Sequence, residues 1–134
     1  MRAPLLVLAA LTAACTLDPV IPAETVPIVP PPAYRVWWEA ARPCVAARPA
    51  WPHAGERQQE RPFETVRWYV TAEPPRDHTG QEGAGLEVDG RIYLHAPWRD
   101  TPWVVQHELV HAIFGIEGHP AEPFQRCQLM WWQQ

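Results

Sequence analysis

The sequence His107-Glu108-Leu109-Val110-His111 is the feature that most constrains how this chain can fold. In an α-helix, residues four positions apart lie on the same face, one turn from each other. A helix through this stretch points the imidazoles of His107 and His111 at one position, and imidazole nitrogen is a preferred zinc ligand. Glu108 follows the first histidine and is placed to hold a metal-bound water rather than the metal. We therefore predict a metal site built on a helix.

The residues on either side of the motif predict where that helix begins and ends. Thr101 and Pro102 are typical of an N-cap and a first helical position, and Gly115 is typical of the residue just after a helix. The predicted helix runs from about Pro102 to Phe114. At 100° per residue its apolar side is opposite the motif and consists of Val105, Leu109 and Ile113. The alternative is a buried helix whose two histidines only make hydrogen bonds.

A catalytic zinc site needs a third protein ligand and one open position. His119 follows the second histidine by eight residues, and Gly115 and Gly118 would let the chain turn back toward the metal. We therefore predict His107, His111 and His119 as ligands of Zn²⁺. Three other residues remain competitors for the third position: Glu117, Glu122 and Cys127.

The N-terminal residues 1–14 have the pattern of a signal peptide. Arg2 provides one positive charge, and the apolar run from Leu5 to Leu11 is too short to span a bilayer. The small residues before Cys15 resemble a bacterial lipobox, although Thr12 replaces the preferred leucine. The resemblance implies lipidation of Cys15 and a place in the bacterial cell envelope, at the outer membrane or on the periplasmic side. Cleavage near Ala14 and secretion is the alternative.

The charge and cysteine content narrow the class of protein. The chain contains eleven basic residues against fifteen acidic ones, with a net charge of −4, so it has no basic stripe for nucleic acid. With Cys15 assigned to lipid, an even pair of cysteines remains in an exported chain. We predict a disulfide between Cys44 and Cys127, which would close a loop of 83 residues.

The remaining sequence predicts a tether followed by one domain. Residues 15–32 are rich in proline, which favours polyproline II structure and predicts an extended tether; packing along the domain surface is the alternative. Residues 33–134 form the predicted domain. We expect a helix at 33–42 that buries Val36, Trp37 and Ala40 and ends at Pro43, a strand at 63–71, and a hairpin of 86–88 and 91–95 around Asp89-Gly90. The fold class is therefore α+β, with a small antiparallel-containing sheet packed on the metal helix.

A strand, a connector and an H-E-x-x-H helix in this order resemble the zincin metallopeptidases, over about Arg91 to Cys127. The resemblance implies a zincin-like domain. It also implies that the strand before the helix, Arg91 to His95, is an edge strand that pairs with an extended substrate. The tail from His119 to Cys127 also resembles small bacterial lipoproteins that carry this motif.

The chain departs from two subgroups of that superfamily. The metzincin pattern places a glycine three residues and a third histidine six residues after the second histidine, whereas Gly115 and His119 lie four and eight residues after His111. In the gluzincins the third ligand is a glutamate on a later helix, and only 23 residues follow His111 here.

These observations predict a zinc-dependent peptidase on the bacterial envelope that acts on a peptide or protein substrate. Glu108 is its general base. Tyr93 and His95 are candidate substrate contacts, although either face of their strand could be core. The alternative is a non-catalytic envelope lipoprotein, a binding or scaffold protein in which zinc and the disulfide only stabilise the fold. The sequence does not predict an oligomeric state.

Overall fold

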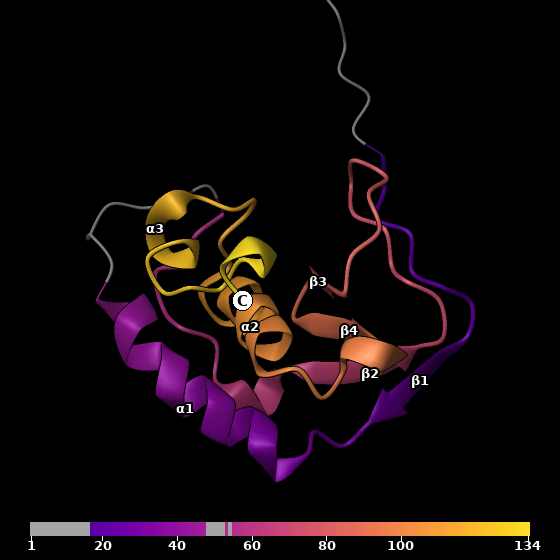
Figure 1. The fold of residues 1–134 in the computed structure, drawn as a ribbon, viewed down its shortest axis with the longest axis horizontal. Coiled ribbons are helices and arrows are strands. Elements are labelled where there is room, and N and C mark those ends of the chain that lie inside the picture. The colour runs from indigo at the N-terminus through magenta and orange to yellow at the C-terminus, as the bar shows by residue number, and fades with distance from the viewer. Residues whose placement is uncertain (1–16, 48–52, 54) are drawn as a thin grey trace, which may run out of the picture.

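The computed structural model describes residues 17–47, 53 and 55–134. The predicted signal peptide, residues 1–14, and the lipidation site Cys15 lie outside the described residues. The described chain is a mixed α+β fold with a four-stranded sheet and three α-helices (Figure 1). None of the helices in this part of the chain is both long enough and apolar enough to cross a bilayer.

The sheet has the strand order β1-β2-β4-β3. Strand β1 is Thr25–Ile28, β2 is Arg67–Thr71, β3 is Gly85–Val88 and β4 is Arg91–His95. The pairs β1–β2 and β3–β4 are antiparallel, whereas β2 and β4 are parallel. The expected hairpin is confirmed as β3–β4, with positive φ angles of 51° at Asp89 and 77° at Gly90. The sheet is therefore mixed, and β1 and β3 are its edges.

The expected tether is wrong in its described part, because that segment joins the sheet. Thr25–Ile28 pairs along β2, and Val20 forms an isolated bridge to Arg76. Proline cannot donate to a strand ladder, but an edge strand leaves one side without a partner and tolerates it, as at Pro27. The extended structure that proline favours is thus used to add a strand rather than to span a gap.

Helix α1, Pro32–Ala46, is longer than predicted and buries a different face. Pro43 lies inside it on an exposed position and does not end it. The buried stripe is Tyr34, Trp38, Ala41 and Val45. The spacing of these residues follows the helical period over three turns, so packing of this longer stripe outweighs the lost hydrogen bond at Pro43.

Helix α2, Pro102–Phe114, has the predicted bounds and fills the centre of the domain. It packs between α1 and the sheet, close to β3 and β4 (Figure 1). Apolar residues cover nearly its whole circumference, which is typical of a helix buried on several sides. The shared core takes Trp68, Ile92 and Leu94 from one face of the sheet and Val105 and Leu109 from the helix.

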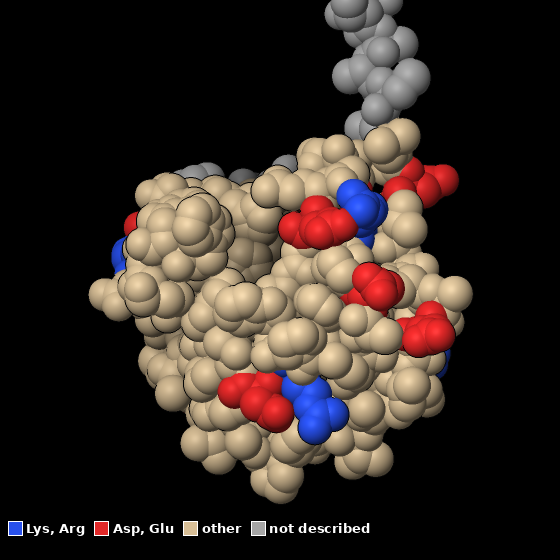
Figure 2. All heavy atoms as spheres, turned by 45° about the vertical axis from the view of Figure 1, so that its right-hand side comes forward, with Lys and Arg blue, Asp and Glu red and all other residues tan. Residues whose placement is uncertain are grey.

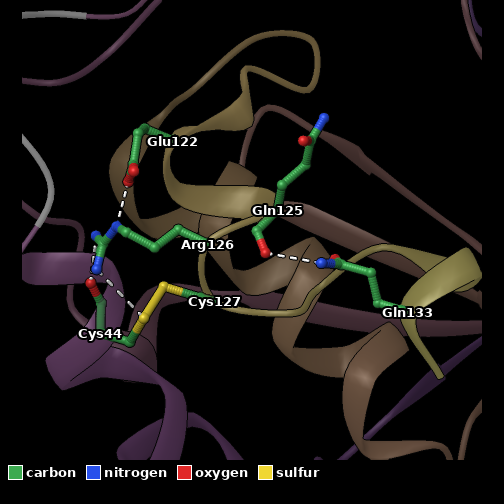
Figure 3. A network of polar contacts seen from close by, with 6 residues as sticks. All are labelled: Cys44, Glu122, Gln125, Arg126, Cys127 and Gln133. Atoms are coloured by element: carbon green, nitrogen blue, oxygen red, sulfur yellow. Dashed lines mark hydrogen bonds and ion pairs between the residues drawn. A yellow bond between two sulfur atoms is a disulfide. The ribbon is translucent and has the colours of Figure 1, made fainter.

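The predicted disulfide between Cys44 and Cys127 is present, with the two Cα atoms 5.9 Å apart. Helix α3 is Ala121–Phe124, and the disulfide joins α1 to the segment that follows α3 (Figure 3). The Arg126 guanidinium reinforces the junction: it donates to the carbonyl of Cys44 at 2.8 Å and pairs with Glu122. The C-terminal segment is thereby fixed to the first helix.

We expect the double variant Cys44→Ser/Cys127→Ser to lose about 4 kcal/mol of unfolding free energy, because the bond closes a long loop in the unfolded chain. Chemical unfolding of the oxidised protein and of the variant measures the difference. Reduced wild type is the matched control and should unfold like the variant. Equal midpoints for oxidised wild type and variant would contradict the prediction.

Candidate metal centre

Three histidine side chains meet beside the C-terminal half of α2. The Nε2 atom of His107 lies 3.3 Å from that of His111 and 2.9 Å from that of His119. Their ligand atoms all lie within 4.8 Å of one another. His107 and His111 are one turn apart on the helix, as predicted, and His119 comes from the loop that follows. The three residues are close enough to bind one metal ion.

Backbone carbonyls determine which ring nitrogen carries the proton in the two helical histidines. Nδ1 of His107 lies 2.7 Å from the carbonyl oxygen of Leu129, and Nδ1 of His111 lies 2.6 Å from that of Ile116. A carbonyl can only accept, so each Nδ1 must donate. In a neutral imidazole the other nitrogen, Nε2, is then an acceptor without a proton.

Burial keeps both of these imidazoles neutral. It lowers the pKa of His107 to about 3 and that of His111 to about 4, from an ordinary value of 6.5. Repulsion from His111 lowers the pKa of His107 further, because a second positive charge would lie close by. Two neutral rings therefore face each other with unprotonated nitrogens, and their lone pairs repel unless a cation lies between them.

The donor set is compatible with a zinc ion: the His107–His111 pair has the spacing that zinc requires, and the His107–His119 pair is slightly closer. Zinc–nitrogen bonds of about 2.0–2.1 Å in a tetrahedral site place two ligand nitrogens about 3.3 Å apart. Zinc-binding histidines commonly donate their other N–H to a carbonyl, which fixes the ring orientation and raises its basicity. Leu129 and Ile116 provide those carbonyls here. The nitrogen atoms fit other transition metals too, so the geometry does not identify the metal.

Two features of the chain bring the third histidine to the helix. Gly115 ends α2 in the left-handed conformation, with φ of 69°, and Gly118 adopts φ of 66° just before His119. Such angles are strained for residues with a Cβ. The buried ring of Phe124 packs against all three imidazoles, with centroid distances of 4.8, 4.8 and 5.2 Å. The Phe124 ring thus packs beneath all three ligands and helps to fix their positions.

The structure does not bring the competing third ligands to this position. Cys127 is oxidised in the disulfide, and the Glu122 carboxylate pairs with Arg126. Glu117 extends toward Gly55, whose backbone it approaches closely. Within residues 17–47, 53 and 55–134, the one group of potential ligands close enough to share a metal is the three histidines.

Glu108 lies between the helix and the edge of the sheet. Its side chain is buried, and burial together with the nearby charge of Glu87 raises its pKa to about 8. Gly85 of β3 faces it so closely that an added Cβ would lie 2.7 Å from the carboxylate oxygen Oε1. A side chain at position 85 would displace this carboxylate.

Tyr93 and His95, predicted as substrate contacts, are not brought to the histidines. Ile92 and Leu94 of β4 face α2, so the alternate residues point to the other face of the sheet. There the Tyr93 ring stacks on Tyr69 at 4.9 Å. The predicted edge strand is also wrong, because β4 pairs on both sides and β3 is the edge next to the site. Because β4 also pairs with β2, a strand far from it in the sequence, β4 lies in the interior of the sheet and not at its edge.

A hollow of about 1190 Å³ lies over this site, and we call it the metal groove. Its floor contains the three histidines and Glu108. One side is formed by residues 83–87, which run from the preceding loop into the edge strand β3, and another by Met130, Trp131 and Trp132 of the C-terminal segment. The face of the molecule in Figure 2 carries mixed charges without a continuous basic patch.

Sequence reasoning missed several parts of this site: Gly85, Ile116, Phe124 and Leu129. Two of them act through backbone carbonyls, for which side-chain patterns give no signal. Phe124 lies in the tail that resembles small lipoproteins, yet its packing needs the fold to be known. Comparisons with protein-family models, with curated proteins and with solved structures found no match. The zincin-like assignment therefore stays a prediction.

The shifted pKa values predict how the stability of metal-depleted protein varies with pH. Folding depresses the pKa of His107 and His111, so the unfolded chain binds more protons and the unfolding free energy falls as pH drops from about 6.5 toward 4. Folding raises the pKa of Glu108 to about 8, so its contribution is lost as the pH rises from 4.5 through 8. We expect maximum stability at about pH 6–7, measured by urea unfolding with a chelator present.

Glu108→Gln tests the alkaline side of this profile. The variant cannot lose a proton there, so its stability should stay level toward pH 8. Glu117→Gln is the matched control and should keep the wild-type profile. An alkaline decline that is identical in wild type and Glu108→Gln would refute the assignment to Glu108.

Proposed function

We propose that this chain is a zinc-dependent peptidase anchored to the bacterial envelope. One observation carries the proposal: unprotonated nitrogens of His107 and His111 converge with His119 in an open groove beside the buried carboxyl group of Glu108. A metal held there would have the groove in front of it. This arrangement matches the needs of metal-assisted hydrolysis better than those of a closed structural site.

In this proposal His107, His111 and His119 hold the zinc ion. When bound, zinc supplies Lewis-acid chemistry: it polarises a carbonyl oxygen and makes water acidic enough to attack near neutral pH. No fourth histidine, cysteine or carboxylate belongs to the group in the described part of the chain. Three protein ligands leave one position open, as catalytic zinc sites require.

Glu108 is the group that accepts and later returns a proton in this scheme. Its burial shields it from bulk water, and its raised pKa means that it holds a proton near neutral pH when no cation is close. A nearby divalent charge favours the carboxylate form, which is the form that can act as a base. The general base would thus become competent only in the metal-loaded protein.

The position of β3 as an edge strand of the described sheet supports a peptide as the substrate. An extended peptide can add to an exposed sheet edge through backbone hydrogen bonds. The β3 residues that line the metal groove begin at Gly85, directly beside Glu108. A peptide paired with this edge would carry its backbone carbonyls past the histidine cluster. This replaces the expected role of Arg91 to His95.

Glu108→Gln tests the proposal. Because the amide keeps the shape of the side chain and removes the base, zinc stoichiometry should stay at the wild-type value while peptide cleavage falls about 10²-fold or more. The measurements are metal content and cleavage of a peptide library. If the wild type binds zinc but cleaves no peptide, the enzyme proposal fails, and the zinc-stabilised binding or scaffold lipoprotein takes its place.

Two further variants separate the ligand from its competitors. His119→Ala should lower zinc affinity, because it removes one of three nitrogens, whereas Glu117→Gln should leave affinity and cleavage unchanged. Competition with a chromogenic chelator measures affinity in both. A clear loss of zinc in Glu117→Gln, with His119→Ala unaffected, would reverse the assignment.

A further inference from the structure

Three large apolar side chains line the metal groove and remain exposed. The exposed fractions are 59% for Leu17, 69% for Trp131 and 53% for Trp132. We call these residues the apolar rim. Exposed apolar residues that gather around one opening, rather than lying scattered, commonly mark a surface that contacts another apolar phase.

The first described residues, 17–20, are fixed at this rim rather than held away from it. The backbone N–H of Leu17 donates to the carbonyl of His78 at 3.1 Å, and the Val20 and Arg76 backbones exchange hydrogen bonds of 2.9 and 3.0 Å. Residues 17–20 therefore lie against the loop that forms one wall of the groove. The predicted lipidation site, Cys15, precedes Leu17 by two residues. Even a fully extended chain covers at most about 7 Å over two residues. A lipid on Cys15 would bring the bilayer to the groove opening.

The residues around the opening of the metal groove indicate which kind of lipid surface it would contact. Tryptophan is favoured at membrane–water interfaces, where its ring is partly apolar and its N–H stays hydrated. Acidic residues outnumber basic ones in the groove lining: Asp77, Glu82 and Asp89 lie in it with one arginine, Arg57, and Glu82 pairs with Arg76 outside the groove. Negative charge near a membrane surface is repelled by anionic lipid and not by zwitterionic lipid.

We propose that the apolar rim rests on a zwitterionic membrane surface and that the metal groove opens directly onto that surface. The proposal rests on the lipid anchor in the proposed function and is independent of zinc and of catalysis. It also narrows the substrate class. A peptide would reach the β3 edge from the membrane surface, so the substrates would be membrane-associated segments rather than freely diffusing peptides.

Fluorescence quenching by lipid tests this orientation. The processed chain, purified from cells with its acyl chains confirmed by mass spectrometry, is reconstituted into phosphatidylcholine vesicles that contain brominated phosphatidylcholine. Bromine quenches tryptophan only at close range. We expect quenching in the wild type, and at least a twofold smaller quenched intensity in Trp131→Ala/Trp132→Ala. Replacing part of the lipid with anionic phosphatidylglycerol should not increase it.

Trp98→Ala is the matched control, because Trp98 is 43% exposed and does not line the groove. It should retain the wild-type quenched intensity. Leu17→Ser provides a second variant that keeps every tryptophan and should also reduce quenching. Circular dichroism of each variant checks that the fold is kept. Glu108→Gln should be quenched like the wild type, so failure of the peptidase proposal leaves this result unchanged.

Two results would overturn the proposal. The first is a Cys15 without acyl chains, and the second is quenching that is absent in the wild type or not reduced in the double tryptophan variant. If, in the second case, the double variant also cleaves soluble peptides more slowly than the wild type, the tryptophans form a substrate wall instead of a membrane contact.

Discussion

The hydrogen bonds from His107 and His111 to the carbonyls of Leu129 and Ile116 determine what this site can do. They place the proton on Nδ1 and leave both Nε2 atoms free to bind a cation. The carbonyl of Leu129 lies two residues after Cys127, whose disulfide fixes the C-terminal segment to α1. The covalent bond thus anchors the segment whose carbonyl orients the His107 ligand.

The same packing that stabilises the domain makes its metal site unfavourable without a cation. Helix α2 is covered by α1 and by the sheet, so His107, Glu108 and His111 lose hydration along with their apolar neighbours. Desolvation disfavours every charged form there, which leaves neutral imidazoles and a neutral carboxyl group. A divalent cation interacts favourably with the free Nε2 lone pairs of the neutral imidazoles, and with Glu108 once its carboxyl group releases its proton, so burial prepares the site for metal.

Local patterns in the sequence predicted the parts of the structure that depend on neighbouring residues. The bounds of α2 followed from Pro102 and Gly115, the hairpin from Asp89-Gly90, and the disulfide from the cysteine count. The failures share a different cause. The strand at Thr25–Ile28 and the internal position of β4 depend on pairing with Arg67–Thr71, which is distant in sequence. Periodicity gives the face of a strand but not its partner.

The hairpin turn shows how a local signal nonetheless sets the geometry of the site. The two residues with positive φ, Asp89 and Gly90, permit a two-residue turn, and a two-residue turn fixes the register of β3 against β4. In that register Gly85 lies beside Glu108, where a side chain would collide with the carboxyl group. A slip of one residue would put Ala84 or Leu86 there and would exchange the two faces of the strand. The Asp89-Gly90 turn therefore determines which β3 residue lies beside Glu108, and thus whether the carboxyl group has space.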